Sequence, residues 1–224
     1  MCAGYGNTLT EEQLKLYFSV PGNLSAIQPR PSIRPTDPVP VVLEENGIRV
    51  LTEARWWLVP SWWTKRLQEL PALFNARAET LTEKPSFLNA FKSRRCLIPA
   101  TCFFEWSGTA GKKQKHVITR CDGAPLAFAG LWEEWRQPDG QALRSCTIIT
   151  TTANEVMAAI HTRMPVILAA SDWDEWLSPA SPPAELQRLL TPCPAEWIEQ
   201  RPVPRAPSAA VESSPPARLP LDWS

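Results

Sequence analysis

The sequence predicts an α+β fold in a single domain, with mixed, mainly antiparallel β-sheets that curl towards a barrel and short flanking helices. Three observations predict this class. Short apolar runs separated by turn residues follow one another from residue 95 to 151, a spacing typical of barrels and sandwiches. Asn46-Gly47 lies between two apolar runs and predicts a β-hairpin. Helical signals are few, and each covers only a short segment.

The N-terminal half is expected to hold one helix, one hairpin and proline-rich connections. A capping box at Thr10–Gln13 predicts a helix that Pro21-Gly22 ends. Five prolines between residues 29 and 40 require an extended chain there. The other elements expected here are the two hairpin strands, a third strand and a short helix, at 41–43, 48–51, 55–60 and 86–93.

The C-terminal half is expected to be mainly strands, with helices near its end. The strands predicted from apolar runs between turn signals are 95–98, 102–106, 114–120, 125–130, 143–151 and 166–168. Asn154 is a helix cap and predicts a helical segment over 155–160, and two more short helices follow near 172–177 and 183–190. We expect residues 2–205 to form the domain and the Pro/Ser/Ala-rich residues 206–224 to form a mostly disordered tail.

Composition narrows the class of protein. The chain has 224 residues and 44% hydrophobic residues, enough for a packed core. Its net charge is zero, so a nucleic-acid partner would require a local basic groove. The six cysteines show no zinc spacing, and no apolar run approaches the roughly 18 residues of a membrane span. We expect a cytoplasmic monomer with reduced thiols, no metal, no cofactor and no membrane partner.

The pair Met1-Cys2 is the first candidate for chemistry. Methionine aminopeptidase removes Met1 when the next side chain is small, which would leave an α-amine and a thiol on one Cα of Cys2. Both groups can add to one aldehyde carbon and close a five-membered thiazolidine. The amine has a pKa of roughly 7.7–8.0, so part of it is neutral and nucleophilic near pH 7. The alternative is that Cys2 belongs to a frayed terminus.

Two further residues are candidates for acid–base catalysis. His161 follows the helical segment capped by Asn154, whereas the other histidine, His116, lies beside lysines and is expected at the surface. Glu105 alternates with Phe103 and is expected to point inward, where a carboxyl has either a partner or a raised pKa. A salt bridge to a nearby arginine is the structural alternative for Glu105.

Two segments are candidates for binding a nucleic acid. Alternation would place Asn75, Arg77 and Glu79 on one face of an extended segment, either as a site wall or as a solvated strand face. Trp62 and Trp63 lie next to Lys65 and Arg66, and aromatic rings with cations hold unpaired bases and phosphates. A place in the core is the alternative for the two tryptophans.

These residues carry a resemblance to the SRAP family, named for SOS response-associated peptidases and including abasic-site processing proteins. The resemblance covers residues 2–168 in order and continues weakly to about 203. The matching segments are Met1-Cys2, Val59-Pro60-Ser61-Trp62-Trp63, 75–80, 95–100, Phe104-Glu105-Trp106, 129–133 and 148–168. The resemblance implies the barrel-like SRAP fold and a bacterial cytosol or nucleoid location.

The resemblance also implies a role for each candidate in DNA damage responses. Cys2 would form a covalent thiazolidine crosslink with the ring-opened sugar of an abasic site in single-stranded DNA, with associated lyase activity. Asn75 and Glu105 would hold and deprotonate the α-amine, and His161 would help to open the sugar ring. The DNA contacts implied are the phosphate-binding Arg77 and Arg163 and the groove-lining Trp62 and Trp63. The zero net charge is compatible with DNA binding if Lys65, Arg66, Arg94 and Arg95 face the same channel as these arginines.

The chain departs from the family pattern at several places, and two of these departures bear on DNA binding and on closure of the fold. Gly4 stands where the family has an arginine that contacts a phosphate. Val203-Pro204 replaces the family's closing strand, and proline cannot donate to a ladder, so an incomplete C-terminal closure is expected. Two other functions stay open: a non-catalytic binder of single-stranded DNA or protein on the same fold, and a cysteine peptidase that uses Cys2 with His161.

Overall fold

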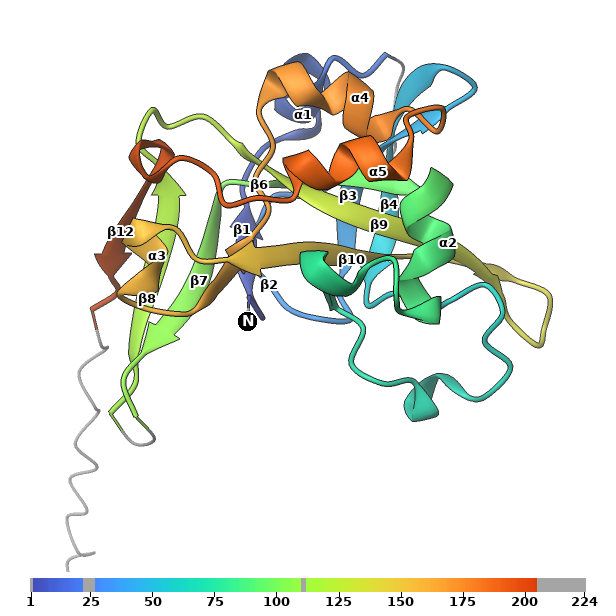
Figure 1. Ribbon diagram of the computed structural model, residues 1–224, viewed down its shortest axis with the longest axis horizontal. Helices are drawn as coiled ribbons and strands as arrows, with labels where there is room; N and C mark the ends of the chain where they lie inside the picture. Colours follow the sequence, from blue (N-terminus) through green and yellow to red (C-terminus); the bar gives the residue numbers. More distant parts are fainter. Residues whose placement is uncertain (1, 22–26, 110–111, 205–224) are drawn as a thin grey trace, which may run out of the picture.

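A closed barrel of five strands forms the centre of the molecule (Figure 1). The computed structural model describes residues 2–21, 27–109 and 112–204. Around the barrel the strands pair in the order β3, β4, β10, β9, β6 and back to β3. All pairs are antiparallel except β4 with β10. The strand bounds are β3 Pro38–Glu45, β4 Ile48–Trp56, β6 Arg95–Ala100, β9 Leu126–Arg136 and β10 Ala142–Thr152. The predicted fold class is therefore confirmed.

A second, antiparallel sheet lies beside the barrel, at the left in Figure 1. Its order is β12, β8, β7, β1, β2, with bounds Ile198–Pro202, Gln114–Arg120, Cys102–Ser107, Tyr5–Asn7 and Arg30–Ile33. The expected incomplete C-terminal closure is wrong. β12 pairs with β8 along its whole length, from Ile198 opposite Arg120 to Pro202 opposite His116. The closing strand ends before Pro204, so that proline removes no donor from the ladder.

Two short strands extend the barrel along β10 and prepare the candidate site. β5 (Asn75–Arg77) runs parallel to β10, and β11 (Arg163–Pro165) runs antiparallel to it. The strand expected at 166–168 is wrong in position, because regular pairing stops at Pro165 and Ile167 forms only an isolated bridge with Phe128. The strand expected at 55–60 is also wrong beyond Trp56, where β4 ends.

The helices are short, as expected. In α1 (Glu11–Phe18) both hydrogen bonds of the capping box are present, and Ser19 ends the helix in a left-handed conformation. The other helices are α2 Pro85–Ser93, α3 Glu155–Ala158, α4 Trp173–Leu177 and α5 Pro183–Leu186. The 3-10 turns are η1 Leu67–Glu69, η2 Ala78–Thr80, η3 Ala170–Asp172, η4 Gln187–Leu189 and η5 Ala195–Trp197. α3 ends two residues before the expected boundary. No helix in the described part of the chain is long and apolar enough to cross a membrane.

Alternate residues of the barrel strands supply two hydrophobic clusters. Val41 of β3 belongs to the inner cluster with Tyr5 and Trp56, whereas its neighbour Val42 belongs to the outer cluster beneath the helices. Because α1, α2, α4 and α5 cover the outer face (Figure 1), both faces of β3 are buried. Cys2 belongs to the inner cluster, so the start of the described chain is packed into the core.

Arg95 is buried beneath the helices, so the condition that it faces a basic DNA channel is not met. Its side chain is 1% exposed and donates to backbone carbonyls at the ends of two helices. The acceptors are Phe91 and Lys92 of α2, Trp176 of α4, and Ser178 just beyond α4. A guanidinium is well suited to this position because helix C-termini carry partial negative charge and unsatisfied carbonyls.

Candidate active site

Cys2 lies at the junction between the barrel and the second sheet. The strand that follows it, β1, pairs with both β2 and β7. The Asn75 Nδ2 of β5 donates a 2.7 Å hydrogen bond to the Cys2 carbonyl, which ties the two elements together. The Cys2 thiol lies 3.6 Å from the Gly4 carbonyl and is 1% exposed. Cys2 is thus held in place, and the alternative of a frayed position is wrong for this residue.

Burial keeps the Cys2 thiol protonated. Burial, together with the nearby charge of Glu105, raises the pKa of Cys2 to about 12. A thiol with this pKa is a poor first nucleophile at neutral pH, because the thiolate is the reactive form. An α-amine at the same residue would be the better first nucleophile, with the sulfur acting second.

Glu105 lies on β7 with its side chain inward, as its alternation with Phe103 predicts. The residue is 3% exposed, and burial raises the pKa of its carboxyl above the ordinary value. Glu105 and His161 line one cavity of about 280 Å³, together with Trp106 and Lys113. The structure therefore brings together the two residues that the sequence nominates for acid–base chemistry.

His161 is oriented by the backbone that follows it. Its Nδ1 accepts a 2.9 Å hydrogen bond from the Arg163 N–H, so in the neutral ring Nε2 carries the proton. Burial lowers the pKa of His161, which favours this neutral ring. Upstream, the Asn154 side chain caps α3 as predicted, accepting from Met157 N at 3.0 Å. The cap fixes the turn from which His161 is delivered.

The predicted single face of Asn75, Arg77 and Glu79 is correct only for the first two residues. They share one face of β5, with Asn75 half-buried and Arg77 exposed. At Ala78 the chain leaves the strand and enters η2, so alternation no longer applies to Glu79. The Glu79 carboxylate instead binds Arg163 with two hydrogen bonds of 2.6 and 3.0 Å.

The two neighbouring tryptophans have different environments. Trp62 is 50% exposed, whereas Trp63 packs against the outer cluster. The Trp63 Nε1 donates to Arg66 O at 3.3 Å, and its carbonyl accepts from Trp135 Nε1 at 2.6 Å. Their ring centroids are 6.3 Å apart at an angle of 54°. Of this pair, Trp62 offers the free ring surface and Trp63 anchors the loop.

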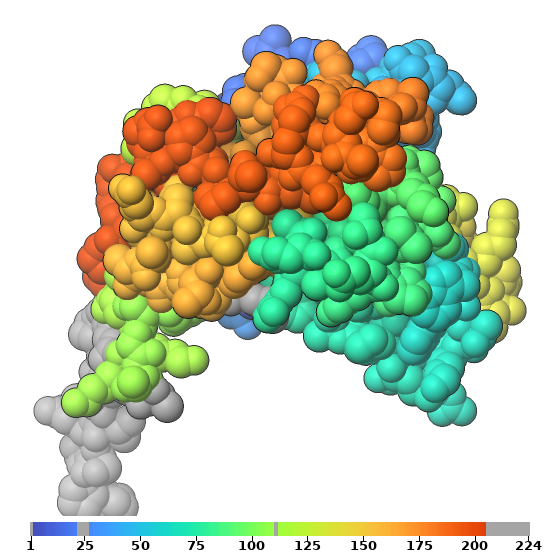
Figure 2. All heavy atoms as spheres, viewed as in Figure 1, coloured from blue at the N-terminus to red at the C-terminus, as the bar shows by residue number. Residues whose placement is uncertain are grey.

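The surface is indented where these elements meet. Figure 1 shows β1 between the β7–β8 hairpin on the left and the loop that carries η1 on the right. In Figure 2 the lower outline recedes between the yellow-green hairpin and the turquoise loop. We call this recess the hollow, and the β7–β8 hairpin and the loop that carries η1 are the two projecting arms beside it.

Sequence reasoning missed several neighbours of the site. Lys113 and Trp106 line the Glu105 cavity, but only the folding of the β7–β8 hairpin brings Lys113 there. His116, expected at the surface, is half-buried and bonded at both ring nitrogens. Its Nε2 lies 2.8 Å from Ser107 Oγ, and its Nδ1 lies 2.7 Å from Gln200 Oε1. The residues next to His116 in the sequence could not predict this burial, because its partner Gln200 belongs to the distant strand β12.

Comparison with known proteins places the chain in a family. The model of the family "SOS response associated peptidase (SRAP)" matches residues 1–209. The abasic site processing protein YoqW of Bacillus subtilis is 39% identical over 189 residues, 84% of each chain. The abasic site processing protein YoaM of the same organism is 41% identical over 174 residues, 77% of this chain and 76% of that protein. The abasic site processing protein HMCES of Gallus gallus is 30% identical over 204 residues, 80% of this chain and 60% of that protein.

Solved structures share the fold. A protein from Bacteroides thetaiotaomicron superposes with a TM-score of 0.83 at 23% identity, covering 91% of this chain and 92% of that one. A protein from Bordetella bronchiseptica superposes with a TM-score of 0.78 at 27% identity, covering 91% and 100%. The family match spans the barrel, the second sheet and every candidate site residue. The chain belongs to the SRAP family.

Proposed function

We propose that this protein processes abasic sites in single-stranded DNA by forming a covalent thiazolidine crosslink between Cys2 and the ring-opened sugar. The observation that carries the proposal is the position of Cys2, held by Asn75 and close enough to Glu105 for its charge to raise the thiol pKa. Its relatives' names, which describe abasic site processing proteins, support the same substrate. The role would be to protect the damaged strand during the DNA damage response.

The chemistry starts with hydrolytic removal of Met1, which frees the Cys2 α-amine. The neutral amine adds to the C1′ aldehyde of the open sugar, and loss of one water gives an imine. The Cys2 sulfur then adds to the imine carbon while the thiol proton moves to nitrogen, which closes the thiazolidine. A raised pKa suits Glu105 to accept the ammonium proton near neutral pH.

His161 and Asn75 would act around this sequence of steps. With Nδ1 occupied by Arg163 N–H, neutral His161 presents Nε2–H, which would donate to the ring oxygen as the sugar opens. Asn75 would hold the Cys2 backbone so that the amine and the thiol face the same carbon. Associated β-lyase activity follows if the imine loses its 3′ phosphate before the sulfur adds.

The two projecting arms would grip the DNA strand. Arg77 is exposed beside the site, and Trp62 offers a half-exposed ring for stacking on a base. Arg163 would contact a phosphate, and Trp63 would support the loop that presents Trp62. The hollow of Figure 2 would admit a single strand between the two arms.

The peptidase alternative has weaker support. A cysteine peptidase needs a thiolate beside its histidine, whereas burial raises the pKa of Cys2 to about 12. Removal of Met1 is the one peptide cleavage that the crosslinking proposal requires. A non-catalytic binder of single-stranded DNA or protein on this fold stays as the second alternative, to be distinguished by experiment.

One gel tests these functions. Protein whose mass shows that it starts at Cys2 is incubated with a single-stranded oligonucleotide carrying one abasic site, then run under denaturing conditions. We expect a slower band that is absent with the intact oligonucleotide and retained in Cys121→Ala, which removes an exposed cysteine elsewhere. Binding in solution without this band would favour the binder, and digestion of casein without it would favour the peptidase.

A further inference from the structure

Both terminal nitrogens of Arg163 are hydrogen-bonded within the protein, in a site where a phosphate contact is expected. Its two terminal nitrogens bind the two oxygens of Glu79, and Nη2 also donates to the Thr150 carbonyl at 2.6 Å. The Arg163 side chain is 14% exposed and that of Glu79 is 49% exposed. The guanidinium is therefore lodged in the protein, while its carboxylate partner lies on the solvent side.

The geometry of this pair matches that of an arginine–phosphate contact. A guanidinium presents parallel N–H donors that fit carboxylate and phosphate oxygens in the same two-point manner. Glu79 occupies both of these donors, so a phosphate cannot take the same position until the carboxylate leaves. The backbone carbonyl of Thr150 cannot leave, and it would keep the guanidinium aimed during the exchange.

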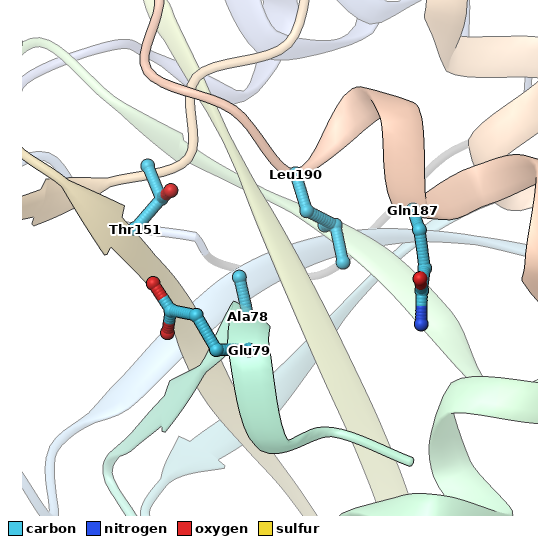
Figure 3. Close-up of a pocket in the computed structure, with 5 residues that line it drawn as sticks. All are labelled: Ala78, Glu79, Thr151, Gln187 and Leu190. Atoms are coloured by element: carbon cyan, nitrogen blue, oxygen red, sulfur yellow. The ribbon is translucent and has the colours of Figure 1, made fainter.

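The structure has room for the displaced carboxylate. A cavity of about 220 Å³ adjoins Glu79 and is lined also by Ala78, Thr151, Gln187 and Leu190. Figure 3 shows Glu79 and Thr151 on one side of this cavity, with Gln187 and Leu190 on the other. The Thr151 hydroxyl and the Gln187 amide are hydrogen-bond donors that a carboxylate could accept from after a side-chain rotation.

We propose that Glu79 is an internal stand-in for a DNA phosphate, which holds Arg163 in the free protein and gives way to a phosphate of the bound strand. The inference rests on the proposed DNA-binding function and adds a regulated contact to it. The Glu79–Arg163 pair lies partly in solvent, where such pairs are weak, so a polyanion can exchange with it. Glu79 would lower non-specific affinity by competing with every strand that the site meets.

The proposal is tested by whether Glu79→Gln strengthens or weakens DNA binding. Glu79→Gln keeps the side-chain shape but removes the competing charge, so Arg163 becomes more available. We expect binding of an intact single-stranded oligonucleotide, measured by fluorescence anisotropy, to tighten by up to about fivefold at low salt. The slope of log affinity against log salt should change by less than the roughly 0.7 of one phosphate contact, because the bound state of both proteins holds the same Arg163–phosphate contact. Weaker or unchanged binding would overturn the proposal. It would mean that Glu79 helps DNA binding by orienting Arg163 and does not compete with the phosphate.

Two controls distinguish release of Arg163 from the general effect of removing one negative charge on DNA affinity. Glu45→Gln removes one negative charge from an exposed pair with Arg144 and should change affinity by much less than Glu79→Gln. In an Arg163→Gln background, Glu79→Gln should give no gain, since the contested donor is gone; an equal gain there would contradict the exchange. Thermal unfolding of each variant checks that the fold is kept.

The outcome is independent of crosslinking. If the wild-type protein fails to crosslink an abasic oligonucleotide but Glu79→Gln binds the intact oligonucleotide more tightly, the stand-in role holds and the proposed chemistry falls. If the wild type crosslinks and Glu79→Gln binds no more tightly, the stand-in role falls and the chemistry stands.

Discussion

Two arginines on different faces of the barrel have different kinds of hydrogen-bond partner. Arg95 lies on the helix-covered face, beneath α2 and α4, and Arg163 lies on the open face, which holds the candidate active site. Arg95, beneath α2 and α4, gives its hydrogen bonds to backbone carbonyls, and burial lowers its pKa to about 10, which still leaves it charged at neutral pH. Arg163, beside the candidate active site, gives two bonds to the half-exposed side chain of Glu79. The difference is whether the partner can move: helix carbonyls cannot, but a surface carboxylate can.

The contrast extends to what each face contributes. The helix-covered face packs the outer cluster and should determine stability. The open face gathers Cys2, Asn75, Glu105 and His161, where burial shifts pKa values without closing the cavity. Substitutions on the helix-covered face should therefore lower the free energy of unfolding and leave the crosslinking rate unchanged. Substitutions on the open face should lower the crosslinking rate and leave the free energy of unfolding nearly unchanged.

The largest effect expected is from Cys2→Ala on the open face. It removes the sulfur that would close the proposed thiazolidine, so the stable crosslink should be lost completely while the unfolding midpoint changes little. The measurement is the denaturing gel beside a thermal melt, with the Met1-free start of both proteins checked by intact mass. A stable crosslink in Cys2→Ala would remove the thiol from the proposed reaction.

Glu105→Gln and His161→Ala should slow crosslinking by about 10²–10⁴-fold, the usual contribution of acid–base groups, without abolishing DNA binding. Because burial raises the pKa of Glu105, the wild-type rate should rise with pH as this carboxyl loses its proton. Glu105→Gln should lack that rise. Single-turnover rates across a pH series test this, and a change within about twofold in either variant would remove that residue from the mechanism.

On the helix-covered face, Arg95→Met should destabilise the fold by about 3–5 kcal/mol, because core carbonyls such as those of Phe91 and Trp176 lose their donor. Arg163→Met should cost less, about 1–3 kcal/mol, since its carboxylate partner is solvated and only one buried carbonyl, that of Thr150, loses this donor. Urea unfolding of both variants measures the pair of values. Equal losses of unfolding free energy in the two variants would contradict the proposed difference between the two faces.

The smallest effect expected is from Gly4→Arg, which restores the family's cation. A Cβ at this position would lie 3.7 Å from the nearest atoms, the Ile33 carbonyl and the Phe104 ring, so the backbone admits a side chain. We expect tighter single-strand binding and a salt slope steeper by about 0.7, one contact's worth. An unchanged slope in an anisotropy salt series would mean that another cation already fills this position.

Local signals predicted the elements whose contacts are local. The capping box of α1 and the Asn46-Gly47 hairpin are both present, the latter with φ of 54° and 78° at the two turn residues. The inward direction of Glu105 followed from strand alternation, because β7 is a regular strand. The nomination of Cys2, Glu105 and His161 needed only their residue types and the family resemblance.

The amino-acid sequence by itself thus determined the fold class, most element positions and the family. Tertiary structure alone decided which cations are available: Arg95 is buried against two helix ends, and Glu79, in the turn η2 after β5, binds Arg163. It also decided that Trp63 anchors a loop while Trp62 stays half-exposed. The physical reason is that local periodicity encodes which face a side chain takes, whereas its partner arrives from a distant segment, 84 residues away for Glu79 and Arg163.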